Sequence, residues 1–163
     1  MPYMVYHYAV LRIVSEGAER MKIAIAADHG GFELKSRMIK YYEKQGLVLT
    51  DLGTYSQDSV DYPDIAAAMA KNILDGAADL GILICGTGIG ISIAANRHKG
   101  IRAAILYSDD AARLAREHNN ANIAVFGGRT MTFEEAVRRF DIFLSAKYEG
   151  GRHDRRLCKL DID

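Results

Sequence analysis

Short apolar runs alternate with longer stretches of helical periodicity along most of the chain. An almost unbroken apolar run is typical of a strand that is buried on both faces. Such runs predict strands at 22–27, 47–51, 80–84, 101–106 and 123–126. The stretches between them place apolar residues three or four positions apart, as on the buried face of an α-helix. They predict helices at 32–45, 62–75, 89–97, 109–117, 132–145 and 154–160.

The regular alternation of strands and helices predicts the fold class. Strands joined through helices form βαβ units, in which the strands are parallel and the crossovers are right-handed. We therefore expect a single-domain α/β protein with a doubly wound, Rossmann-like sheet. Its five parallel strands should follow the order 2-1-3-4-5, with helices on both faces. In such a sheet the ligand binds outside the carboxyl ends of strands 1 and 3, where the winding reverses.

Residues 1–20 do not follow this pattern. An apolar and aromatic stretch at 3–11 is interrupted by Arg12 and has neither a basic leader nor a clear cleavage site, which argues against a signal peptide. Met21 resembles a second start of the chain. We expect 1–20 to be an N-terminal extension, with an added partner-binding element as the alternative, and 21–163 to be the functional domain.

Composition and charge narrow the class of partner. The chain has 163 residues, with 21 Lys and Arg, 21 Asp and Glu, and a formal net charge of zero. Domains that bind nucleic acid usually carry a strongly basic footprint, so no nucleic-acid partner is expected. The two cysteines form neither a disulfide framework nor a zinc-ligand pattern, which indicates a reducing, cytoplasmic location. No apolar run approaches the roughly 20 residues that span a bilayer, so no membrane association is expected.

Two glycine-rich loops follow strands 1 and 3, where the ligand is expected. The first is Asp28-His29-Gly30-Gly31, and the second runs from Cys85 to Gly90 with the sequence CGTGIG. Glycines let backbone N–H groups approach a ligand, and a helix that begins there adds a partial positive charge, which suits a reactive thiol. Cys85 is therefore a candidate base or nucleophile, with a small core residue as the alternative. The loop is not a dinucleotide fingerprint, because that pattern requires glycine where Ile91 stands.

Basic residues indicate an anionic ligand. Arg129 follows strand 5 and should lie at the same edge of the sheet as Cys85. Arg152 and Arg156 are four residues apart and share one face of a helix. Guanidinium groups suit phosphate oxygens, which favours a phosphorylated small molecule, with a solvated helix face as the alternative. Asp28 also has a structural alternative as a helix N-cap, and His118 has one at a helix C-terminus.

Taken as a set, the motifs of this chain resemble the type B ribose-5-phosphate isomerases, which form a wider group with the galactose-6-phosphate isomerases. They occur in the family's order between 21 and about 161. They are Asp28-His29-x-Gly31, Asp61-Tyr62-Pro63, Cys85-Gly86-Thr87-Gly88-x-Gly90-x-Ser92-Ile93-Ala94-Ala95-Asn96, His118-Asn119, Gly128-Arg129 and Gly150-Gly151-Arg152-His153-x-x-Arg156.

This resemblance implies a reaction and a set of roles. The reaction is the interconversion of ribose 5-phosphate and ribulose 5-phosphate in the pentose phosphate pathway, with no cofactor and no metal. Cys85 would move the proton between C1 and C2, because Ile89 stands where the branch of the family with a glutamate base carries that residue. The remaining implied roles are enediolate binding by Thr87 and the amides of Gly86, Gly88 and Gly90, ring opening by His118, sugar binding by Asp28, Tyr62 and Asn119, and phosphate binding by His29, Arg129, Arg152 and Arg156.

Topology adds a prediction about His118. The helix at 109–117 starts at the ligand edge and runs back to the opposite end of the sheet, about one strand length or roughly 16 Å away. His118 could not then reach Cys85 of its own chain. We predict that His118 completes the site of a neighbouring subunit in a two-fold homodimer, and the pairing of dimers into a tetramer stays open.

Other functions remain open at this point. The same chemistry could act on a six-carbon phosphate such as allose 6-phosphate or galactose 6-phosphate, because the sequence does not reveal the length of the pocket. A phosphosugar- or nucleotide-binding module without catalysis would leave Cys85 without a role. A structural or interaction protein would leave the whole group at the carboxyl ends of strands 1 and 3 unexplained.

Overall fold

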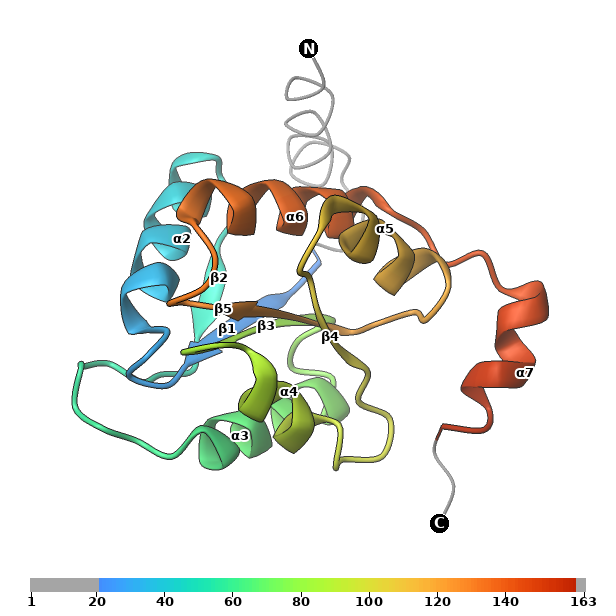
Figure 1. The fold of residues 1–163 in the computed structure, drawn as a ribbon, viewed down its shortest axis with the longest axis horizontal. Coiled ribbons are helices and arrows are strands. Elements are labelled where there is room, and N and C mark those ends of the chain that lie inside the picture. The colour runs from blue at the N-terminus through green and yellow to red at the C-terminus, as the bar shows by residue number, and fades with distance from the viewer. Residues whose placement is uncertain (1–20, 161–163) are drawn as a thin grey trace.

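A five-stranded parallel sheet lies between two layers of helices in the computed structural model, which describes residues 21–160 (Figure 1). The strands are β1 (Ile23–Ala27), β2 (Leu49–Asp51), β3 (Leu80–Cys85), β4 (Ala103–Ile105) and β5 (Ile123–Gly127). The helices are α2 (Phe32–Lys44), α3 (Tyr62–Leu74), α4 (Ile89–Ala95), α5 (Asp109–Glu117), α6 (Phe133–Ser145), the 3-10 helix η1 (Gly151–His153) and α7 (Asp154–Leu157). The doubly wound α/β fold is confirmed, and the last helix ends at Leu157 instead of residue 160.

Two further sequence predictions concern residues 1–20 and membrane association. The extension predicted at 1–20 lies outside the described residues. Within 21–160, no helix combines the length and the apolarity that a membrane crossing requires.

The strand order is β2-β1-β3-β5-β4, so the predicted order 2-1-3-4-5 is wrong at its last two places. All of β5 is buried, whereas the three residues of β4 are only half-buried. The longer apolar strand therefore takes the interior position and the short one takes the edge. There the Asn96 side chain donates to the Ala103 carbonyl at 2.8 Å and accepts from the Ala103 N–H at 2.9 Å, which satisfies part of the exposed edge. The expected ligand position is unaffected, because β1 and β3 remain neighbours.

The two faces of the sheet bury different kinds of side chain. In β1, Ile23 and Ile25 pack on the face covered by α2, α5 and α6, whereas Ala24 and Ala26 pack on the face covered by α3 and α4 (Figure 1). On the second face the helices approach the sheet closely, since a Cβ added to Gly81 of β3 would lie only 2.7 Å from the Met69 sulfur. Met69 belongs to α3, so this close packing holds α3 against β3.

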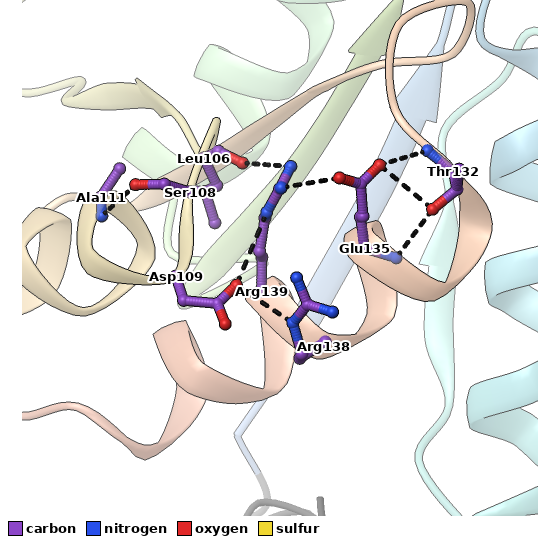
Figure 2. Close-up of polar contacts among 8 residues, drawn as sticks. All are labelled: Leu106, Ser108, Asp109, Ala111, Thr132, Glu135, Arg138 and Arg139. Atoms are coloured by element: carbon purple, nitrogen blue, oxygen red, sulfur yellow. Dashed lines mark hydrogen bonds and ion pairs between the residues drawn. The ribbon is translucent and has the colours of Figure 1, made fainter. Parts of the chain in front are cut away.

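A polar network joins the start of α5 to α6 (Figure 2). The buried Arg139 donates to the Glu135 carboxylate at 2.9 Å and lies 3.7 Å from the Asp109 carboxylate, which also pairs with Arg138 at 3.0 Å. Ser108 caps α5 by accepting a backbone N–H of its first turn at 3.1 Å. Because its first turn is held in this way, α5 has a fixed direction. It ends on the side of the sheet opposite the carboxyl ends of the strands.

Candidate active site

The Cys85 thiol lies where β3 ends and the turn into α4 begins. The residue is 5% exposed, and its Sγ accepts a hydrogen bond from the Gly88 N–H at 3.1 Å. Gly88 has a φ of +82°, a left-handed conformation that residues with side chains rarely adopt, and this turn directs its N–H back towards the sulfur. A backbone donor aimed at sulfur suits a thiolate, which is the form of cysteine that abstracts protons.

Three loops at the carboxyl ends of β1, β3 and β5 pack closely together, and we call them the rim. Where they touch, their glycines leave no room for a Cβ atom. A Cβ on Gly30 would lie 2.9 Å from the Gly86 nitrogen, and one on Gly128 would lie 2.5 Å from the Gly30 carbonyl oxygen. Backbone hydrogen bonds tie the same loops, from the Gly128 N–H to the Cys85 carbonyl at 2.8 Å and from the Arg129 N–H to the Gly86 carbonyl at 2.9 Å. The glycines thus let three backbone segments meet around the thiol.

Asp28 and His29 both make hydrogen bonds to the backbone of the rim. Asp28 is buried, and its Oδ1 accepts from the N–H groups of Gly30 at 2.8 Å and Gly31 at 3.2 Å. These contacts stabilise a turn that precedes α2, whose N-cap residue is Gly31 without a side-chain cap, so the N-cap alternative for Asp28 is wrong. His29 Nδ1 accepts from the Val60 N–H at 3.3 Å, which assigns the ring proton of neutral His29 to Nε2. His29 therefore fixes the loop before α3 and retains a donor at Nε2.

Tyr62, Thr87 and Arg129 lie around the same thiol loop. The Tyr62 ring rests on the backbone of Gly90, where an added Cβ would meet the ring at 2.8 Å, and the residue remains 41% exposed. The Arg129 guanidinium lies over Gly86, where an added Cβ would be 3.3 Å from it. Thr87 is exposed within the loop. The rim therefore combines a thiol, a hydroxyl, an aromatic ring and a cation.

An ion pair between the buried Lys35 and the half-buried Asp51, which the sequence analysis did not identify, holds the loop leading to Tyr62. Lys35 of α2 is 1% exposed, and its ammonium donates to the Asp51 carboxylate at 2.5 Å. The same carboxylate accepts from the Gly53 N–H at 2.9 Å, and the Tyr55 ring lies 5.3 Å from the ammonium. A buried charge requires such a partner. The sequence signal for this pair is a lysine on the apolar face of the helix predicted at 32–45.

His118 lies at the opposite end of the sheet, as the topology predicts. It is the C-cap residue of α5. The chain then enters β5 at Ile123, which pairs with Gly81 near the start of β3, whereas Cys85 pairs with Gly127 at the other end. His118 and Cys85 are therefore separated by nearly the length of β3 within one chain. That a partner subunit uses His118 stays a prediction.

The C-terminal segment brings Arg152 to the end of α5. The Glu149 N–H donates to the Glu117 carbonyl at 3.0 Å. The His118 and His153 rings are stacked with their centroids 4.3 Å apart, and the Arg152 Nε–H donates to His153 Nε2 at 3.3 Å. Burial, and after it the neighbouring cationic groups, lower the pKa of His153, which is therefore neutral at pH 7. The sequence analysis assigned no role to Glu149 or His153, because no local pattern pairs them with the end of α5.

The predicted site residues thus form two groups. The rim brings together Asp28, His29, Tyr62, Cys85, Gly86, Thr87, Gly88, Gly90 and Arg129. The far end holds His118, Asn119, Arg152 and Arg156. Figure 1 shows α7, which carries Arg156, standing apart from the sheet beyond α5. The first group is equipped for chemistry at a thiol, and the second offers cations and an imidazole.

Comparison with known proteins identifies close relatives over nearly the whole described region. The model of the ribose/galactose isomerase family matches residues 23–160. Ribose-5-phosphate isomerase B of Escherichia coli is 45% identical over 136 residues, which cover 83% of this chain and 91% of that protein. The crystal structure of a Thermotoga maritima ribose 5-phosphate isomerase has a TM-score of 0.85 at 54% identity, covering 88% of this chain and 99% of the other. Mycoplasma genitalium ribose-5-phosphate isomerase B, solved with bound ribulose-5-phosphate, has a TM-score of 0.81 at 42% identity, covering 86% and 93%.

Proposed function

The chain belongs to the ribose/galactose isomerase family, and on this basis we propose that it is an aldose–ketose isomerase that interconverts ribose 5-phosphate and ribulose 5-phosphate. The observation that carries the proposal is the buried Cys85 thiol on the rim, with a backbone donor at its sulfur and Arg129 in the same loops. Relatives with this activity in their names, one of them with ribulose-5-phosphate bound, support the choice of substrate. The reaction would form part of the pentose phosphate pathway.

Cys85 is the base in this proposal. Its thiolate removes the proton from C2 of the open-chain aldose, the C2–H electron pair forms the C1=C2 bond, and the carbonyl pair moves onto O1. The O2 hydroxyl proton then passes to O1, the thiol returns its proton to C1, and C2 becomes the carbonyl carbon. Because only protons and bonding pairs shift within the sugar, no redox cofactor is required. We propose that the reaction uses neither a cofactor nor a metal. A positioned base of this kind accelerates a reaction by about 10²–10⁴-fold.

The oxygen that becomes negative during this transfer needs donors already in place. The N–H groups of Gly86 and Gly90 and the Thr87 hydroxyl would supply them, joined by the Gly88 N–H when it turns from the Cys85 sulfur to the substrate. Removal of one such donor typically costs about 3–4 kcal/mol of transition-state stabilisation. Asp28 and Tyr62 would bind the sugar next to the thiol. His29 and Arg129 would hold the phosphate and so fix the distance between the anchored end and the reacting carbons.

The remaining roles belong to a second subunit in this proposal. His118 would assist ring opening, Asn119 would bind a sugar hydroxyl, and Arg152 and Arg156 would complete the phosphate site. Their place at the far end of the sheet supports a two-fold homodimer in which each rim receives these residues from its partner. The position of α7, apart from its own sheet, also supports this arrangement.

Two inactive variants, mixed together, test the shared site. Cys85→Ala and His118→Ala should each have little activity as homodimers. If one site takes Cys85 from one subunit and His118 from the other, random exchange makes about half of the dimers mixed, and each mixed dimer has one intact site, so about a quarter of wild-type turnover should return. Turnover of ribose 5-phosphate is measured after the subunits are exchanged by mild denaturation and refolding. Sites formed within single subunits would give no gain over the separate variants.

A panel of sugar phosphates tests the reaction itself. Ribose 5-phosphate, allose 6-phosphate and galactose 6-phosphate are offered side by side in a coupled assay, and ribose 5-phosphate should have the highest kcat/KM. A higher kcat/KM for a six-carbon phosphate would show that the substrate is a hexose phosphate, and the family assignment would stand. If the folded protein turns over none of them but binds ribitol 5-phosphate, which has no carbonyl group, it is a binding module and the enzyme proposal is wrong.

A further inference from the structure

Three potential metal ligands converge where the C-terminal segment meets the end of α5. Within residues 21–160, His118, Glu149 and His153 each offer one ligand atom, and these three atoms lie within 4.8 Å of one another. Glu149 Oε2 is 3.9 Å from His118 Nε2 and 3.6 Å from His153 Nε2. Two ligand atoms on a tetrahedral zinc ion with bonds of about 2.1 Å are separated by roughly 3.4 Å. Shifts of a few tenths of an ångström would therefore bring either histidine and Glu149 to coordination distance.

The backbone that carries these side chains is anchored, whereas two of the side chains can turn. The hydrogen bond from the Glu149 N–H to the Glu117 carbonyl fixes the segment against α5, and His153 is 3% exposed. The His118 and Glu149 side chains are 33% and 52% exposed. In the stacked arrangement the two imidazole planes differ by only 16°, so their nitrogen lone pairs lie in nearly parallel planes and do not meet at one point. Rotation of the more exposed His118 ring about its side-chain bonds would direct both Nε2 atoms at a single ion.

We propose that His118, Glu149 and His153 form a binding site for a divalent transition-metal ion of the Zn²⁺ type. Two imidazoles and one carboxylate are a ligand set that Zn²⁺ accepts, and the exposed side of the cluster leaves a fourth position for water. Within one chain this site lies at the end of the sheet opposite Cys85, so the thiol of the same chain is not one of its ligands.

Metal binding would rearrange Arg152. The Arg152 Nε–H donates to His153 Nε2 at 3.3 Å, and the ion needs the same lone pair, so Arg152 must leave that position. The positive charge of Arg152 opposes a dication, which indicates weaker binding than that of structural zinc sites. One consequence rests on the proposed function: the ion would remove His118 and Arg152 from the substrate site, and Zn²⁺ would inhibit sugar-phosphate turnover.

Direct binding of Co²⁺ and Zn²⁺ to the full chain tests the site. The protein is freed of metal with a chelator and desalted, Co²⁺ binding is followed by the visible absorption of the four-coordinate ion, and Zn²⁺ binding is followed by calorimetry. Glu149→Gln and His153→Gln should each weaken binding by at least about 10-fold, because even the loss of a supporting residue around a metal ligand costs 10–100-fold. Since His153 is buried, its variant is checked for folding by circular dichroism, and the exposed Glu149 carries the test if that variant unfolds.

Matched controls separate this site from others. Glu134→Gln removes an exposed carboxylate that lies 3.9 Å from Arg37, and His98→Gln removes a histidine outside both groups; both should bind metal like the wild type. Cys85→Ala should also retain binding. The proposal is wrong if Glu149→Gln and His153→Gln bind as tightly as the wild type, or if binding is lost with Cys85→Ala. Metal that binds here without inhibiting turnover would contradict the role of His118 in ring opening, and metal binding by a protein without turnover would contradict only the proposed function.

Discussion

Replacing Cys85 with alanine should lower kcat for ribose 5-phosphate by about 10³-fold or more. A positioned base typically contributes about 10²–10⁴-fold to the rate. Alanine has no group that can carry the proton between C1 and C2, and the other bases of the rim, Asp28 and His29, accept hydrogen bonds from backbone N–H groups. The proposed phosphate contacts are made by other residues, so binding should survive. The measurements are steady-state turnover and the Kd of ribitol 5-phosphate, which should change by less than about threefold.

The second cysteine is the matched control for this prediction. Cys158 is exposed, follows α7 and should be replaceable by alanine without loss of turnover. Circular dichroism would show that Cys85→Ala keeps its fold, because removal of one buried sulfur leaves only a small cavity. Turnover by Cys85→Ala within about 10-fold of the wild type would contradict the assignment of the base.

The stability of the fold should fall as pH rises through the range set by Asp141. This side chain of α6 is buried and accepts a hydrogen bond from the Tyr42 hydroxyl of α2 at 2.8 Å. Burial raises the pKa of Asp141 from 3.8 to about 7, and the hydrogen bond from Tyr42 opposes that shift only in part. Between these two values the folded protein holds a proton that the unfolded chain has released, so the free energy of unfolding decreases with rising pH. The full loss, complete above pH 7, is about 4 kcal/mol.

Asp141→Asn should remove this pH dependence. The amide cannot ionise, and its carbonyl oxygen can still accept from the Tyr42 hydroxyl. At pH 8 the variant should therefore be more stable than the wild type by up to about 4 kcal/mol, and at pH 4 the two should be nearly equal. Urea unfolding at both pH values and one protein concentration measures the difference.

An exposed aspartate provides the comparison. Asp75 pairs with Lys71 on the surface of α3, and Asp75→Asn should change stability by less than about 1 kcal/mol at either pH. Histidines titrate in the same range, so only the difference between wild type and variant isolates Asp141. A variant that is less stable than the wild type at pH 8 would show that the Asp141 carboxylate is not destabilising.

Local patterns account for the elements and for most of the rim. The apolar runs locate all five strands, because burial on both faces leaves a mark on consecutive residues. Cys85 and Gly88 are three positions apart, so the thiol, the left-handed turn and the donor at the sulfur belong to one short stretch of sequence. The far position of His118 also follows from the sequence, since a helix that leaves the carboxyl edge of a parallel sheet must return to the opposite edge.

Contacts between distant segments were decided only by the tertiary structure. Lys35 and Asp51 are 16 positions apart, and Tyr42 and Asp141 are 99 apart. A periodic pattern identifies the buried face of a helix, but it does not identify the element that covers this face.

The order of the last two strands and the cluster beside His118 have the same explanation. The apolar pattern predicts that β4 and β5 both belong to the sheet, but their order depends on which strand is covered more completely by helices from elsewhere in the chain. Glu149 and His153 reach His118 because the chain turns back after α6 and bonds to the end of α5. The sequence by itself therefore determined the fold class, the rim and the place of its thiol. Only the packing of complete helices and strands decided which distant side chains meet, because that depends on the burial of whole elements and not on neighbouring residues.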